Sequence, residues 1–182
     1  MAGPGVDPSR ADTGPAVPGQ AGAGRAPGGD NTDTNDGLAW LGNQWQLDHV
    51  PVRRELSERP LVVMGLEHKL QQVFLNLLLN ARDAMPKGGW LSVTTRVEGD
   101  RVIAEVADTG SGIPSEQIAR IYDPFFTTKT IGRGTGLGLS ITYGIVREHD
   151  GTILCDSAVG QGTRFTMALP QAPAAARSAR AN

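Results

Sequence analysis

The sequence has a single cysteine and no long hydrophobic run. That cysteine, Cys155, excludes an internal disulfide and a metal cluster held by several thiolates. No apolar stretch approaches the ~18 residues that a membrane-spanning helix requires, and the N-terminus lacks the apolar centre of a secretory signal peptide. We therefore expect a cytoplasmic protein with no membrane segment in this chain.

An excess of one sign of charge is also lacking. The 182 residues contain 17 basic and 19 acidic side chains, a net charge of −2. Residues 1–37 contain five Asp and two Arg, and residues 171–182 contain two Arg, which leaves the central part at −1. A nearly neutral domain offers no broad basic surface, so we expect no nucleic acid as a partner. An anionic ligand would have to be held by local groups.

Large apolar residues are scarce at both ends of the chain. Residues 1–37 hold 9 of the 24 glycines and 5 of the 12 prolines, and residues 171–182 are rich in alanine. Such segments bury too little apolar surface to offset the entropy lost on ordering. We therefore predict a disordered head over 1–37, a folded domain over 38–170 and a disordered tail over 171–182.

Hydrophobic periodicity predicts an α+β fold for the central part. Helices are predicted from Glu67 to Met85 and from about Gly136 to Glu148, with a short helical piece near 116–121. Strands are predicted near 61–65, 90–97, 101–107, 152–155 and 163–169. This order implies a two-layer α/β sandwich in which helices cover one face of a mixed sheet. The loops before the second long helix are left free for function.

A stripe of amides follows the first long helix. Gln72, Asn76 and Asn80 are spaced at i, i+4 and i+8, so their side chains project in nearly one direction. A solvated helix face is the ordinary interpretation of this spacing taken alone. An Asn carbonyl oxygen is also a usable ligand for Mg²⁺, which takes its other ligands from water and phosphates.

An acidic turn directly follows a predicted strand, in Asp108-Thr-Gly-Ser-Gly112. A carboxylate at the end of a strand can accept a hydrogen bond from an exocyclic amine. Gly110 and Gly112 allow the backbone to approach a ligand closely. An ordinary Asp-Gly turn is the alternative interpretation.

A glycine-rich segment, Gly132–Leu139, leads into the second long helix. Glycines before a helix expose backbone N–H groups at the positive end of its dipole, which suits a phosphate. The segment is not a P-loop, because no Lys-Ser or Lys-Thr pair follows the last glycine. A flexible hinge is the alternative interpretation.

The motifs taken together resemble the ATP-binding domain of sensor histidine kinases, which belongs to the Bergerat-fold superfamily with gyrase and the mismatch-repair ATPases. The resemblance extends from about Gly65 to Pro170 and also includes Asp123-Pro-Phe-Phe126 and Gly162-Thr-Arg-Phe165. The strings Asn80-Ala-Arg-Asp-Ala-Met85 and Thr127–Arg133 are most similar to the nitrogen-regulation and dicarboxylate-sensing branch of these kinases.

The resemblance implies ATP and Mg²⁺ as cofactors. Asn80 would bind the metal, and Asn76 would assist near the phosphates. Asp108 would accept a hydrogen bond from the adenine amino group with the help of Thr163. The remaining positions that it implies are Gly110 and Gly112 beside the base, Phe125 and Phe126 at the base of the ATP lid, and Gly134, Thr135, Gly136, Leu137 and Gly138 at its hinge and phosphate contacts.

The chain departs from the family pattern at Asp83, where many histidine kinases have Lys three residues after the metal-binding Asn. Lys129 or Arg133 on the lid is expected to supply that cation. Superfamily members that hydrolyse ATP typically carry Glu at the position of Asn76, as the base for water. An amide cannot accept that proton, so phosphotransfer is favoured over hydrolysis.

None of the three histidines, His49, His68 and His149, lies in the two-helix hairpin pattern of a phosphoacceptor domain. We therefore expect a monomer that phosphorylates, in trans, a histidine on a dimerisation and phosphoacceptor domain absent from this chain, with a response regulator as an indirect partner. A nucleotide-binding module without transferase activity, which docks to a partner in an ATP-dependent way, is the second reading. A serine/threonine kinase of the anti-sigma-factor type is the third.

Overall fold

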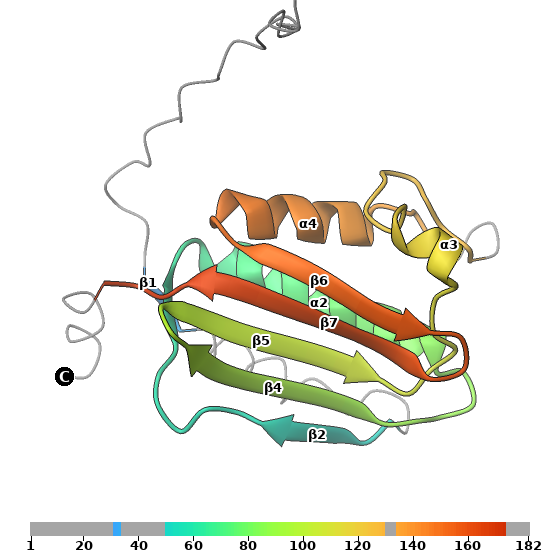
Figure 1. Ribbon diagram of the computed structural model, residues 1–182, viewed down its shortest axis with the longest axis horizontal. Coiled ribbons are helices and arrows are strands. Elements are labelled where there is room, and N and C mark those ends of the chain that lie inside the picture. The colour runs from blue at the N-terminus through green and yellow to red at the C-terminus, as the bar shows by residue number, and fades with distance from the viewer. Residues whose placement is uncertain (1–30, 34–49, 130–133, 174–182) are drawn as a thin grey trace, which may run out of the picture.

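Five strands form one mixed sheet in the order β2-β4-β5-β7-β6 (Figure 1). The structure is a computed structural model that describes residues 31–33, 50–129 and 134–173. Neighbouring strands are antiparallel except for β2, which runs parallel to β4. The strands are β2 (Val52–Glu55), β4 (Leu91–Glu98), β5 (Arg101–Asp108), β6 (Thr152–Ala158) and β7 (Gly162–Pro170).

Helices pack on one face of this sheet, which confirms the predicted two-layer α+β architecture. They are α2 (Glu67–Ala84), α4 (Gly138–Glu148) and the short α3 (Ser115–Ile118). The apolar face predicted for α2 is the face that is buried, through Leu70, Val73, Phe74, Leu77, Leu78 and Ala81. Among the described residues, no helix is long and apolar enough to cross a bilayer.

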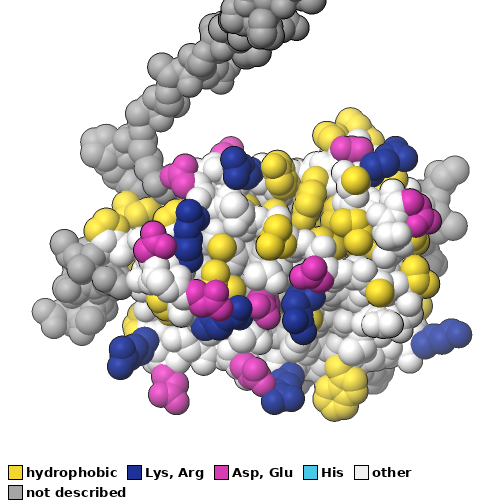
Figure 2. Space-filling view, viewed as in Figure 1, with side chains coloured by type: hydrophobic (Ala, Val, Ile, Leu, Met, Phe, Trp, Pro, Cys, Tyr) yellow, Lys and Arg dark blue, Asp and Glu magenta, His cyan; other side chains and the backbone are white. Residues whose placement is uncertain are grey.

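The strands alternate between a buried and a solvated face. Val102 and Val106 of β5 and Met167 of β7 belong to the core under the helices. On the opposite face, Arg96 of β4 pairs with Glu105 of β5 at 2.8 Å. Figure 2 shows that acidic and basic side chains are interspersed on the side of the molecule that faces the viewer.

Two short pairings lie at or beyond the predicted domain boundaries. β1 (Asn31–Asp33), inside the segment predicted to be disordered, pairs with β3 (Val62–Met64) in an antiparallel arrangement. At the other end, the backbone N–H of Ala172 donates to the carbonyl of Val62 at 2.8 Å, and Ala172 is buried. The packed domain therefore continues past Pro170, where the sequence predicted its end.

His149 links the end of α4 to the start of α2. Its Nδ1 lies 2.7 Å from the carbonyl oxygen of Ile145, and its Nε2 accepts the backbone N–H of Leu66 at 3.3 Å. A neutral ring with its proton on Nδ1 satisfies both contacts, so this histidine is structural. His68 is exposed on α2, and His49 lies outside the described residues.

We expect Gly65→Ala to lower the free energy of unfolding by about 1–3 kcal/mol, the usual penalty for overpacking. A Cβ at Gly65 would overlap the imidazole of His149. The measurement is denaturant unfolding of four proteins: the wild type, Gly65→Ala, His149→Ala and the double variant. The Gly65 substitution should be milder in the His149→Ala background, and an equal loss in both backgrounds would contradict this contact as the cause.

Candidate functional site

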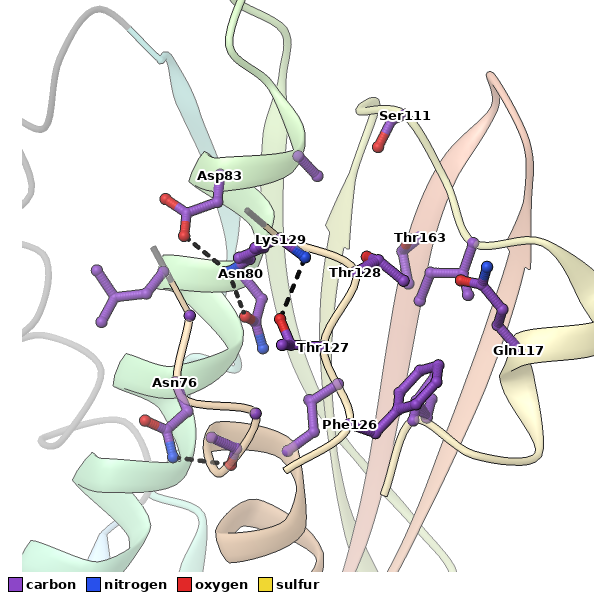
Figure 3. Close-up of a pocket in the computed structure, with 18 of the residues that line it drawn as sticks. Asn76, Asn80, Asp83, Ser111, Gln117, Phe126, Thr127, Thr128, Lys129 and Thr163 are labelled. Carbon is purple, nitrogen blue, oxygen red and sulfur yellow. Dashed lines mark hydrogen bonds and ion pairs between the residues drawn. The ribbon is translucent and has the colours of Figure 1, made fainter. Parts of the chain in front are cut away.

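A cavity of about 640 Å³ lies between α2, the end of β5 and the segment that leads into α4 (Figure 3). Its volume falls within the range of about 300–1,000 Å³ typical of small-molecule sites. Most of the site residues predicted from the sequence line it, namely Asn76, Asn80, Asp108, Gly112, Lys129, Gly134, Thr135, Gly136, Gly138 and Thr163. Gly110 and Leu137 were also predicted, and neither is among the lining residues.

Asp108 is the last residue of β5 and lies opposite Thr163 of β7. Its side chain is buried, and its Oδ1 accepts the backbone N–H of Gly110 at 2.8 Å. Burial raises the pKa of Asp108 above its usual value, although backbone hydrogen bonds from Gly110 and Thr163 act in the opposite direction. A carboxylate has about four acceptor sites, so these bonds leave capacity for a donor on a ligand.

The glycines after Asp108 allow the loop that follows β5 to pack closely against the ends of α2 and β6. A Cβ at Gly110 would overlap the backbone of Ala84 at the end of α2. Gly112 has a φ of 68°, and a Cβ there would overlap the carbonyl oxygen of Ala158 at the end of β6. Both glycines are therefore required by packing within the protein itself.

One wall of the cavity is apolar. It is formed by Ile113, Ile121, Phe126, Leu139 and Phe165. The guanidinium of Arg120 lies 4.7 Å from the ring centroid of Phe126, a cation–π contact that supports this wall. An apolar wall beside the Asp108 carboxylate suits a flat ring that carries one hydrogen-bond donor.

The lid, residues 126–135, is closed at its base by a backbone hydrogen bond. The N–H of Phe125 donates to the carbonyl of Gly136 at 2.9 Å, and both residues have positive φ. The side chain of Phe125 is 74% exposed and, unlike Phe126, does not line the cavity. Arg133 was a predicted source of cationic charge and lies outside the described residues.

The two asparagines of the stripe make different contacts. The Nδ2 of Asn76 donates to the carbonyl of Gly138 at 3.1 Å and to Thr142 Oγ1 at 3.3 Å. This amide therefore holds the first turn of α4 against α2. The Oδ1 of Asn80 accepts a hydrogen bond from Lys129 Nζ at 3.2 Å.

Lys129 also pairs with Asp83, whose Oδ2 lies 2.7 Å from the same ammonium (Figure 3). Burial raises the pKa of Asp83, but hydrogen bonds and charges from Lys129 and Arg82 outweigh this effect and lower it overall. Asp83 is therefore ionised at neutral pH. From the sequence, Asp83 was noted only as a departure from the family pattern, in which many members have Lys at this position.

The Oδ1 of Asn80 accepts one hydrogen bond from a cationic group, the Lys129 ammonium, and an amide oxygen has a second lone pair for another ligand. Among the described residues, no group of three or more His, Cys, Asp or Glu side chains could hold a metal ion. A metal bound through that second lone pair would thus depend on phosphate oxygens and water for most of its ligands. Mg²⁺ bound to a nucleotide fits that requirement.

Comparison with known proteins bears directly on this geometry. Residues 65–173 match the family described as histidine kinase-, DNA gyrase B-, and HSP90-like ATPase. The chain belongs to this ATPase family. The match includes every residue that lines the cavity, from Asn76 to Phe165, and ATP is the ligand that the family name implies.

Sensor kinases are prominent among the relatives of this ATPase domain. Sensor kinase CckA of Brucella abortus (strain 2308) is 48% identical over 118 residues, which are 57% of this chain and 12% of the relative. Sensor histidine kinase ZraS of Escherichia coli (strain K12) is 46% identical over 140 residues, 77% of this chain and 30% of the relative. The chain thus spans less than a third of either relative.

Solved structures of histidine kinases share the fold of this ATPase domain. The mycobacterial sensor histidine kinase MprB gives a TM-score of 0.69 at 25% identity, covering 80% of this chain and 99% of that one. The catalytic domain of histidine kinase ThkA gives 0.66 at 27% identity, covering 78% and 96%. The chain is homologous to the catalytic domains of sensor histidine kinases, and its assignment to the nitrogen-regulation branch stays a prediction.

Proposed function

We propose that this domain binds Mg²⁺-ATP and transfers the γ-phosphoryl group to a histidine on a separate dimerisation and phosphoacceptor domain. The observation that carries the proposal is that Asp108, Asn80 and the glycines before α4 line one cavity. A response regulator would then receive the phosphoryl group from that histidine. The domain alone would be a monomer, and its use of ATP favours the cytoplasm as its compartment.

The base would occupy the end of the cavity at Asp108. An ionised carboxylate only accepts hydrogen bonds, so it would accept from the amino group of adenine and disfavour the carbonyl of guanine. The hydroxyls of Thr163 and Ser157 lie 3.0 Å apart, which would fix the orientation of Thr163 beside the base. Ile121, Phe126 and Phe165 would contact the ring faces.

The phosphates would lie toward Asn80 and the N-terminus of α4. Backbone N–H groups of the lining residues Gly134, Thr135, Gly136 and Gly138 and the positive end of the helix dipole favour anions there. Lys129 would contribute a positive charge, and Asn80 would ligate Mg²⁺. When bound, Mg²⁺ neutralises charge on the transferring phosphoryl group, so the protein contributes mainly by positioning the reactants.

Asn76 favours transfer to a protein over hydrolysis. Its amide cannot accept a proton from water, and its NH₂ group donates to Gly138 and Thr142. Water at the phosphoryl group would therefore lack a base at this position. A nucleotide-binding module that docks to a partner in an ATP-dependent way remains the second candidate, because an amide at this position also suits slow turnover of bound ATP.

The test is phosphotransfer from γ-labelled ATP to a separately purified phosphoacceptor hairpin of a sensor histidine kinase. We expect an acid-labile label on the hairpin, and Asn80→Ala should reduce the rate by about 100-fold, as for loss of one charge-stabilising group. Gln72→Ala is the matched control, since Gln72 is an exposed amide of the same stripe outside the cavity. ATP binding without transfer would support the docking module, and an acid-stable label would indicate a serine or threonine kinase.

A further inference from the structure

The contact between Asp83 and Lys129 lies on the phosphate side of the cavity and joins two distant parts of the chain. Lys129 Nζ lies 2.7 Å from Asp83 Oδ2 and 3.2 Å from Asn80 Oδ1. Asn80 and Asp83 are three residues apart on α2, so their side chains are neighbours on one helix face. A single ammonium group therefore reaches both oxygens, as Figure 3 shows.

The other oxygen of the Asp83 carboxylate is also engaged. Oδ1 accepts from Arg82 at 3.1 Å through Nε and at 2.9 Å through Nη2. The Asp83 side chain is 29% exposed and that of Lys129 is 34% exposed, so this ion pair is partly shielded from solvent. Asp83 is held by Arg82 on one side and presents its second oxygen to Lys129.

Local contacts within the lid also restrict the position of Lys129. The N–H of Lys129 donates to Thr127 Oγ1 at 3.2 Å, which forms a local turn. Gly134, on the opposite side of the lid, packs against Thr127 and the side-chain carbons of Lys129. Gly134 thus lies beside the aliphatic part of Lys129, whose ammonium group extends to α2.

We propose that Asp83 is a positioning residue, which holds the Lys129 ammonium beside Asn80 so that it is in place for the phosphates of the nucleotide. This proposal rests on the function proposed above. A free lysine would lose side-chain entropy when it engaged a phosphate, and a lysine already held in the cavity loses less. Lys129 in turn neutralises a carboxylate that would otherwise repel the triphosphate.

The two residues consequently act as one unit in nucleotide binding. With Asp83 present, Lys129→Met removes an attraction and also exposes an unpaired carboxylate to the phosphates. With Asp83→Asn already in place, the same substitution removes only the attraction of an unheld lysine. We expect Lys129→Met to weaken ATP binding by about tenfold or more in the wild-type background and by about threefold or less in the Asp83→Asn background.

The first experiment is a double-mutant cycle in which the dissociation constants of ATP and of adenosine are measured by calorimetry. Adenosine lacks phosphates, so its affinity should be the same in all four proteins. Equal losses of ATP affinity in both backgrounds would overturn the proposal, and so would a parallel loss of adenosine affinity. Lys129→Arg should retain most of the ATP affinity, because it keeps the charge.

The second experiment needs no nucleotide, so it separates this proposal from the proposed function. Trypsin cleaves after Lys129 only when its side chain enters the protease. We expect Asp83→Asn to accelerate cleavage at Lys129 by about three- to tenfold, the effect of losing one partly shielded ion pair. Asp156→Asn is the control, since it makes the same substitution on the exposed face of β6. Equal cleavage rates in all three proteins would overturn the proposal even if ATP binds.

Discussion

The Asp108→Asn variant should lose the thermal stabilisation that Mg²⁺-ATP gives to the wild-type domain. At 100 times its dissociation constant a ligand adds about 2.7 kcal/mol to the free energy of unfolding, or roughly 5–20 °C in Tm for a domain of this size. Asn places an NH₂ donor where the adenine amino group needs an acceptor, so two donors would face each other. The measurement is thermal unfolding of both proteins with and without millimolar Mg²⁺-ATP.

The nucleotide-free variants provide the control for this experiment. Burial raises the folded-state pKa of Asp108, so the ionised carboxylate opposes folding once the pH rises through that pKa. The wild type should therefore lose stability relative to Asp108→Asn as the pH rises from the ordinary pKa of an Asp side chain through the raised folded-state pKa of Asp108. A variant that is unfolded without nucleotide would contradict this account of Asp108, whereas an equal ATP shift in both proteins would contradict its role at the base.

The Gly162→Ala substitution should destabilise the domain far more than Gly160→Ala, although both glycines lie near the same β6–β7 turn with positive φ. A left-handed backbone costs any residue with a Cβ about 1–2 kcal/mol, which both variants incur. A Cβ at Gly160 has nothing within 4 Å. At Gly162 it would overlap the carbonyl oxygen of Asp108, which adds about 1–3 kcal/mol of overpacking.

The same clash should damage the site as well as the fold. Asp108 pairs with Thr163, the residue after Gly162, so a displaced strand would move the carboxylate at the end of the cavity. Chemical denaturation gives the stability of each variant, and calorimetry of the folded fraction gives its affinity for ATP. We expect Gly160→Ala to bind ATP like the wild type, and equal stability losses for both variants would contradict the packing argument.

The elements that local patterns encode were predicted well. The apolar face of α2 repeats at helical spacing over five turns. A pattern of this length distinguishes a helix from a strand. The second long helix begins at Gly138 and not at Gly136 as predicted, because Gly136 has a φ of 67°, outside the helical range. Strand β2 was missed because Val52–Glu55 contains two arginines and one glutamate, and its place depends on pairing with β4.

The candidate site likewise contains residues that local motifs predict and residues that depend on contacts between distant parts of the chain. The sequence identified Asn80 and Asp108 as site candidates, because their motifs occur in the order found in the family that the chain resembles, and both residues line the cavity. The ion pair of Asp83 with Lys129 joins positions 46 residues apart, and no local pattern records such a distance. Phe165 was named only as the end of the Gly162-Thr-Arg-Phe165 motif and was given no role in the site, since strand alternation gives the buried face but not which cavity that face meets.

Because the lid is closed at its base, a change in the length of this loop should have little effect on the stability of the core. Phe125 and Gly136 are joined by a backbone bond, so the loop leaves and re-enters the domain at one point. The entropy of closing a loop rises slowly with length, by about 0.6 kcal/mol for each doubling. Insertions and deletions there are therefore among the mildest changes that the fold can accept. Evolution, or a designer who grafts a reporter peptide, could remodel the segment that we propose lies nearest the phosphates of ATP while the rest of the fold stays as it is.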